Sequence, residues 1–87
     1  LNIEWKNLSA CSLTASTTIA LQANTTDSIK VVLDGNWLGN NGTMTRENDG
    51  QAWTFKADEN NCVLKTDVAG DYIFTWNFEN SQLTVTY

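Results

Sequence analysis

The sequence has no histidine and only two cysteines, and this shortage limits its chemistry. Histidine is the commonest general base and a frequent metal ligand, and two cysteines without a second pair do not make a zinc site. No nucleophile motif is present, so carboxylates are the remaining catalytic candidates. Five acidic residues fall in predicted turns, where they are expected to be solvated: Asp34, Asp49, Asp58, Glu59 and Asp71. We therefore predict that the domain is not an enzyme and holds no metal or other cofactor.

Positive charge is scarce as well. The chain has five Lys and Arg residues against ten Asp and Glu residues, which gives a formal net charge of −5. Five cations do not neutralise a phosphate lattice against that excess of acid, so we expect neither nucleic acid nor an anionic membrane as partner. No run of about 18 apolar residues exists, so no membrane insertion is expected. A neutral ligand or a protein partner remains.

Length and composition indicate one β-domain. A chain of 87 residues forms one hydrophobic core, so residues 1–87 are predicted to be a single domain. Only 17% of the residues are charged, and Thr, Asn and Ser are abundant, which is typical of extracellular or cell-surface β-domains. The start at Leu1 rather than Met suggests one module of a larger secreted or surface protein.

The two cysteines, Cys11 and Cys62, have two interpretations. In an extracellular domain they are predicted to form a disulfide, which would stabilise the fold by about 4 kcal/mol. In a reducing compartment they would be two buried free thiols. Three Asn-x-Ser/Thr sequons begin at Asn7, Asn24 and Asn41, and they matter only in a eukaryotic secretory pathway.

Alternating apolar and polar residues predict about seven short strands. They are expected at 1–5, 17–21, 28–33, 51–57, 62–66, 71–78 and 83–87, with turn residues between them. No segment has helical apolar spacing, so the prediction is an all-β, antiparallel, immunoglobulin-like β-sandwich. The alternation also predicts inward-facing residues, namely Trp53, Phe55, Tyr72, Phe74, Leu83 and Val85.

The longest stretch without a strand pattern runs from Asp34 to Asp49 and contains Trp37 among Gly and Asn residues. A long loop in a small domain is usually functional or mobile. Trp37 is therefore either an exposed platform for a ligand or a cap that folds back over one end of the sandwich.

Short motifs in residues 28–78 resemble those of starch-binding modules, including the repeated modules of starch-binding outer-membrane lipoproteins. In order they are Leu33-Asp34-Gly35-Asn36-Trp37, Met44, Asp49-Gly50-Gln51-Ala52-Trp53 and Ala69-Gly70-Asp71-Tyr72-Ile73-Phe74. The resemblance implies that Trp37 stacks on glucose. The chain departs from that family at Thr75, where a lysine often lies, and at 79–81, where a longer loop normally carries a second Trp.

The expected ligand-binding residues surround Trp37 or follow the last of these motifs. They are Asn36, Trp37, Asn40, Asn41, Thr75 and Trp76. The resulting expectation is a non-catalytic module that binds starch or another α-glucan and tethers a neighbouring enzyme or surface complex to the polysaccharide. The alternative is a structural immunoglobulin-like spacer, or a protein-interaction or adhesion domain, that contacts neighbouring domains of the same polypeptide.

Overall fold

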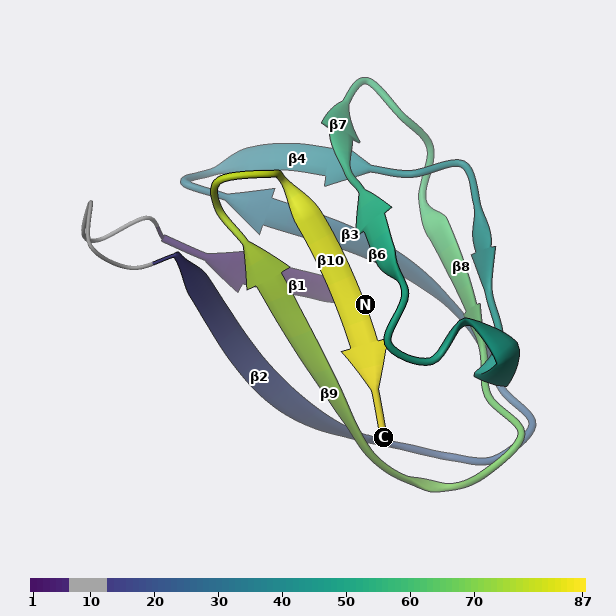
Figure 1. Ribbon diagram of the computed structural model, residues 1–87. Coiled ribbons are helices and arrows are strands. Elements are labelled where there is room, and N and C mark those ends of the chain that lie inside the picture. The colour runs from purple at the N-terminus through teal and green to yellow at the C-terminus, as the bar shows by residue number, and fades with distance from the viewer. Residues whose placement is uncertain (7–12) are drawn as a thin grey trace.

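The computed structural model describes residues 1–6 and 13–87, and within them ten strands form two sheets (Figure 1). The first sheet contains β1 (Asn2–Trp5), β3 (Thr26–Leu33), β4 (Asn36–Gly39), β5 (Thr43–Met44), β7 (Lys56–Ala57) and β8 (Cys62–Lys65). The second contains β2 (Thr14–Leu21), β6 (Ala52–Thr54), β9 (Gly70–Asn77) and β10 (Gln82–Thr86). One short 3₁₀ turn, η1 (Arg46–Asn48), lies between β5 and β6.

The prediction of an all-β fold is confirmed, but the strand count and the pairing are not those expected. The first sheet has the order β5-β8-β3-β4-β7, with β1 also paired to β3, and the second has the order β2-β9-β10-β6. Two pairs are parallel, β1 with β3 and β5 with β8, so the first sheet is mixed rather than antiparallel. The described residues contain ten strands instead of about seven.

Part of the difference lies in the stretch 34–49, which is not an irregular loop. Leu33 pairs with Asn36, so Asp34 and Gly35 alone make the turn between β3 and β4. Both have positive φ, 50° and 81°, as a two-residue hairpin turn requires. The Asp-Gly pair is a strong hairpin signal when strand residues flank it, so this hairpin has a local signature in the sequence.

The remaining difference lies in 51–57, which was expected to be one strand. The chain pairs with β10 through β6, crosses the core at Phe55, and pairs with β4 through β7. Phe55 is 1% exposed and is therefore the residue at which the chain passes from one sheet to the other. Sequence alternation is unbroken through this crossing, so a single strand was predicted.

The core lies between the two sheets and draws on both of them. Figure 1 shows β10 in front of β3 and β9 in front of β1. Of the six predicted core residues, five are buried: Phe55, Tyr72, Phe74, Leu83 and Val85. The sixth, Trp53, is half-buried and packs against this core. A Cβ at Gly42 would lie 2.4 Å from the Trp53 ring, so the ring needs a glycine at that position.

Cys62 is a free thiol in the structure and lies in this core with no exposed surface. Burial raises its pKa from 9.0 to about 11, against a smaller opposing effect of the Val63 backbone. The expected partner Cys11 and the sequon residue Asn7 lie outside the described residues, so the disulfide stays a prediction. No helix in 1–6 or 13–87 is long and apolar enough to span a membrane.

Candidate functional site

Trp37 lies on a strand and remains largely exposed. It is the second residue of β4 and lies opposite Val32 of β3. The Trp37 side chain is 53% exposed, whereas Val32 is only 8% exposed. Its neighbour Leu38 packs against the core, so Trp37 points away from the core on the outer face of the first sheet. Trp37 is therefore an exposed aromatic on a sheet face and not a buried cap.

The side chains of the two asparagines that follow β4, Asn40 and Asn41, are hydrogen-bonded within the protein. The Asn40 side chain donates to the Thr54 carbonyl at 2.7 Å, and its Oδ1 accepts from the Gly42 N–H at 2.7 Å. The Asn41 side chain donates to the Glu59 carboxylate and accepts from the Asn60 N–H at 3.2 Å. The Asn41 bonds hold the β4–β5 connection against the β7–β8 turn, and the Asn40 bond holds it against the end of β6.

Asn36 differs from these two asparagines. It is the first residue of β4, one position before Trp37, and its side chain is exposed. Successive strand residues point to opposite faces, so Asn36 lies on the same side of the sheet as Leu38 and not on the outer face that carries Trp37.

An open cleft of about 360 Å³ lies beside this region. It is lined by Asn40, Asn41, Gly42, Thr54, Lys56 and Glu59. Lys56 pairs with Gly39, two residues along β4 from Trp37, so register places Lys56 and Trp37 on the same face. Sequence reasoning missed Lys56, Thr54 and Glu59 because pairing of β4 with β7 was not expected.

Thr75 and Trp76 are not part of this region. Both belong to β9 in the second sheet, and the Thr75 hydroxyl is 3.0 Å from that of Ser16 on β2. Trp76 has no exposed surface, so its assignment as a ligand contact is wrong. Its ring stacks on Trp5 at 6.2 Å and meets Phe55 edge-on at 6.3 Å. The period-two alternation of Tyr72, Phe74 and Trp76 is the signal that places Trp76 in the core.

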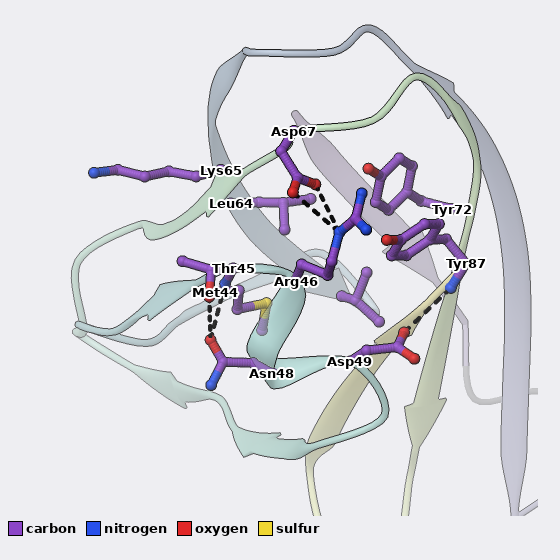
Figure 2. A pocket seen from close by; sticks show the side chains of 11 residues that line it. Met44, Thr45, Arg46, Asn48, Asp49, Leu64, Lys65, Asp67, Tyr72 and Tyr87 are labelled. Atoms are coloured by element: carbon purple, nitrogen blue, oxygen red, sulfur yellow. Dashed lines mark hydrogen bonds and ion pairs between the residues drawn. The ribbon is translucent and has the colours of Figure 1, made fainter.

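A second concave region lies at the end of the sandwich that carries η1 (Figure 2). Tyr72 and Tyr87 stack with ring centroids 5.0 Å apart, and the Arg46 guanidinium lies 5.4 Å from the Tyr87 ring centre. Arg46 also pairs with Asp67 at 3.0 Å. The internal space is about 20 Å³, enough for one water molecule and too small for a sugar ring.

Tyr72 anchors this end of the sandwich. Its hydroxyl donates to the Val68 carbonyl at 2.6 Å, four residues upstream. Burial raises the pKa of Tyr72 above 10.0, with Tyr87 and Asp67 adding to the effect and Arg46 opposing it. These bonds indicate a structural role.

Comparison with known proteins finds no matching family model, curated protein or solved structure. Within 1–6 and 13–87, no group of three or more His, Cys, Asp and Glu residues is placed to hold a metal ion. The candidate site is the exposed face around Trp37, because it combines an exposed aromatic ring with a neighbouring open cleft.

Proposed function

We propose that this domain is a non-catalytic carbohydrate-binding module for starch or another α-glucan, with Trp37 as its stacking platform. The observation that carries the proposal is the 53% exposure of Trp37 on the outer face of the first sheet. A large aromatic ring exposed on a paired strand presents a flat apolar surface to a ligand. One face of a pyranose ring is apolar and matches the flat surface of an indole.

The support behind Trp37 favours a rigid platform. Val32 lies directly opposite it, and β3 is held by β1, β4 and β8. Aromatic and β-branched residues opposite each other on a sheet face pack favourably. A ring held in this way loses little freedom when a ligand binds, which favours affinity.

Polar groups near the platform supply hydroxyl partners. Because the Asn40 and Asn41 amides already bond within the domain, we assign the sugar contacts first to Lys56. Lys56 is exposed on the same face as Trp37 and offers three donors. The net charge of −5 suits a neutral polysaccharide better than an anionic one.

We also propose that the domain is an immunoglobulin-like sandwich, and two features support this. The Tyr72 hydroxyl bonds to the backbone four residues upstream, near the start of β9, as in the tyrosine corner of Greek-key sandwiches. The two sheets packed around one core also suit that class, although the first sheet is mixed. This likeness supports the motif resemblance to starch-binding modules.

One aromatic platform gives weak binding by itself. Taken by analogy with base stacking, it contributes about 1–3 kcal/mol, and a few hydrogen bonds add about 1 kcal/mol each. The dissociation constant is then roughly millimolar to tens of micromolar. Retention on a polymer would come from several modules acting together, consistent with a tether for a neighbouring enzyme or surface complex outside the cell.

A structural spacer or adhesion domain is the second candidate, and one observation favours it. The Asn40 and Asn41 side chains, expected to bind sugar, are engaged in internal hydrogen bonds. In that case the Trp37 face would contact a neighbouring domain of the same polypeptide.

Affinity electrophoresis in gels with amylose, amylopectin or glycogen distinguishes the two. We expect the unmodified domain to be retarded and Trp37→Ala to migrate as it does without polysaccharide. In a thermal melt, Trp37→Ala should lower the free energy of unfolding by about 1 kcal/mol or less, because removing an exposed ring leaves no cavity in the core. Ile73→Ala is the matched control, since Ile73 is 40% exposed on the other sheet. If the unmodified domain is not retarded in any of these gels, the glucan proposal is wrong.

A further inference from the structure

β2 is the one long free edge strand among the described residues. It has eight residues and pairs only with β9, in a continuous register from Thr14 opposite Asn77 to Leu21 opposite Gly70. The strands that end the sheets elsewhere, β5, β6 and β7, have two or three residues, and β1 has four. Short edge strands protect a sheet from pairing with another chain, and β2 lacks that protection.

Charge does not protect this edge either. Residues 7–26 contain no Asp, Glu, Lys or Arg, and β2 lies within that run. Proteins usually protect long edges with a lysine, a proline or a bulge. β2 has none of the three, and among the described residues no strand pairs with the side of β2 that faces away from β9, so the N–H and C=O groups on that side are open to pairing.

An exposed leucine extends the same edge. The Leu13 carbonyl accepts from the Phe78 N–H at 3.0 Å, which continues the β2–β9 register by one residue. Leu13 is 59% exposed. Alternation places it on the same face as Ile19 and Leu21, both of which pack against the core.

We infer that β2 is a self-association surface, and that a second copy of this chain pairs with it antiparallel about a two-fold axis through Thr17. The two four-stranded sheets then form one continuous sheet. The interface is isologous, which is the commonest symmetry of homodimers.

The register follows from matching the faces of the two sheets. In a paired sheet, an inward residue of one copy must lie opposite an inward residue of the other copy. This condition holds only when the two-fold axis passes through a residue, which then lies opposite the same residue of the second copy. An axis at Thr17 places Leu13 opposite Leu21 of the second copy and Ala15 opposite Ile19 of the second copy. This register pairs all of 13–21 and covers the exposed Leu13, whereas an axis at Thr18 leaves Leu13 unpaired.

The charge distribution favours a second copy as the occupant. Two chains of net charge −5 repel, yet no charged side chain lies on the paired strands. On the neighbouring strand β9 the charged residue is Asp71, opposite Ala20 and one strand behind the edge. Self-pairing at β2 is thus an arrangement that keeps like charges apart in this acidic domain.

The dimer should be weak. One strand edge of nine residues covers less than the roughly 800 Å² per partner of a stable interface. We expect a dissociation constant between about 10 µM and 1 mM. Sedimentation equilibrium without any sugar, over protein concentrations of about 10 µM to 1 mM, covers this range.

Two double variants at exposed positions test the register itself. Ser16 lies opposite Thr18 of the second copy, and both side chains are exposed on the outer face. Ser16→Lys with Thr18→Lys opposes lysine to lysine twice and should weaken dimerisation about tenfold or more. Ser16→Glu with Thr18→Lys opposes glutamate to lysine twice and should dimerise at least as well as the unmodified chain.

The two double variants are closely matched controls for each other. Both lose the hydrogen bond between Ser16 and Thr75, and both place charges at the same positions. The lysine pair makes a chain of net charge −5 less negative, so general repulsion predicts stronger association for it. Only pairing along β2 predicts the reverse order.

Leu13→Ser provides a third measurement. It should weaken the dimer while leaving the monomer's melting temperature nearly unchanged, because Leu13 is 59% exposed. Backbone NMR peaks of 13–21 should shift with concentration. A monomer at all concentrations, equal dimerisation of the two double variants, or concentration-dependent shifts confined to other strands would each overturn the inference.

Discussion

Replacing Phe74 by alanine tests whether the core has been identified correctly. Phe74 lies in the middle of β9, between Thr17 of β2 and Val85 of β10, and has no exposed surface. Removing a buried Phe side chain costs about 3–5 kcal/mol, because the transfer free energy is lost and a cavity remains. Domains of this size have a total stability of about 5–15 kcal/mol, so the variant loses a large share of it.

Urea denaturation followed by tryptophan fluorescence is a suitable assay. Trp76 is stacked on Trp5 in the core, so unfolding exposes it and changes its emission. With a slope of about 1.5 kcal/mol/M, a loss of about 4 kcal/mol moves the midpoint by roughly 2–3 M. Should Phe74→Ala be unfolded without urea, Phe74→Leu gives a smaller loss of about 1–2 kcal/mol.

Ile73→Ala is the matched control for this measurement. Ile73 is the preceding residue of the same strand, points to the outer face and is 40% exposed. It should cost less than about 1 kcal/mol. Equal losses for the two variants, or a loss below about 1 kcal/mol for Phe74→Ala, would show that the inward face of β9 is assigned wrongly.

Two further predictions concern Cys62 and Gly39. Folding raises the pKa of Cys62, so with the thiols kept reduced the contribution of the neutral thiol to folding stability should be fully present below about pH 9 and lost as pH rises toward about 11. The difference in free energy of urea unfolding between the unmodified chain and Cys62→Ala should therefore shrink over that pH range. A difference that stays constant would contradict the prediction. A Cβ at Gly39 would lie 2.2 Å from the Asn60 carbonyl oxygen and 2.6 Å from that of Glu59, so Gly39→Ala should cost about 1–3 kcal/mol in urea unfolding. Gly50→Asn should be far milder, because φ is 77° and nothing lies near a Cβ there; equal losses for the two glycines would rule out the backbone clash as the cause.

The all-β class and most of the core are readable from the sequence, because both depend on period-two alternation. Tyr72, Phe74 and Trp76 recur at every second position, and a strand turns every second side chain to the same face. The same rule identifies Leu83 and Val85 in β10. Local pattern suffices here because the strand is long and one of its faces is apolar.

The strands in 34–57 depend on tertiary contacts. β5 and β7 have two residues each, and such short segments carry too little alternation to stand out, whereas β4 is signalled locally by the Asp34-Gly35 turn. β7 pairs with β4, and β5 pairs in parallel with β8, which are partners distant in sequence. Pairing of this kind is decided by contacts between distant segments and not by local pattern.

For the candidate site, the sequence by itself determined that Trp37 is the aromatic to examine, since Gly and Asn residues surround it and offer it no core. Tertiary structure alone decided that it lies on a sheet face with Lys56, that the Asn40 and Asn41 amides are engaged elsewhere, and that Trp76 is buried. Residue type limits what a side chain can do. Its exposure and its neighbours follow from strand register, which is set by contacts between distant segments.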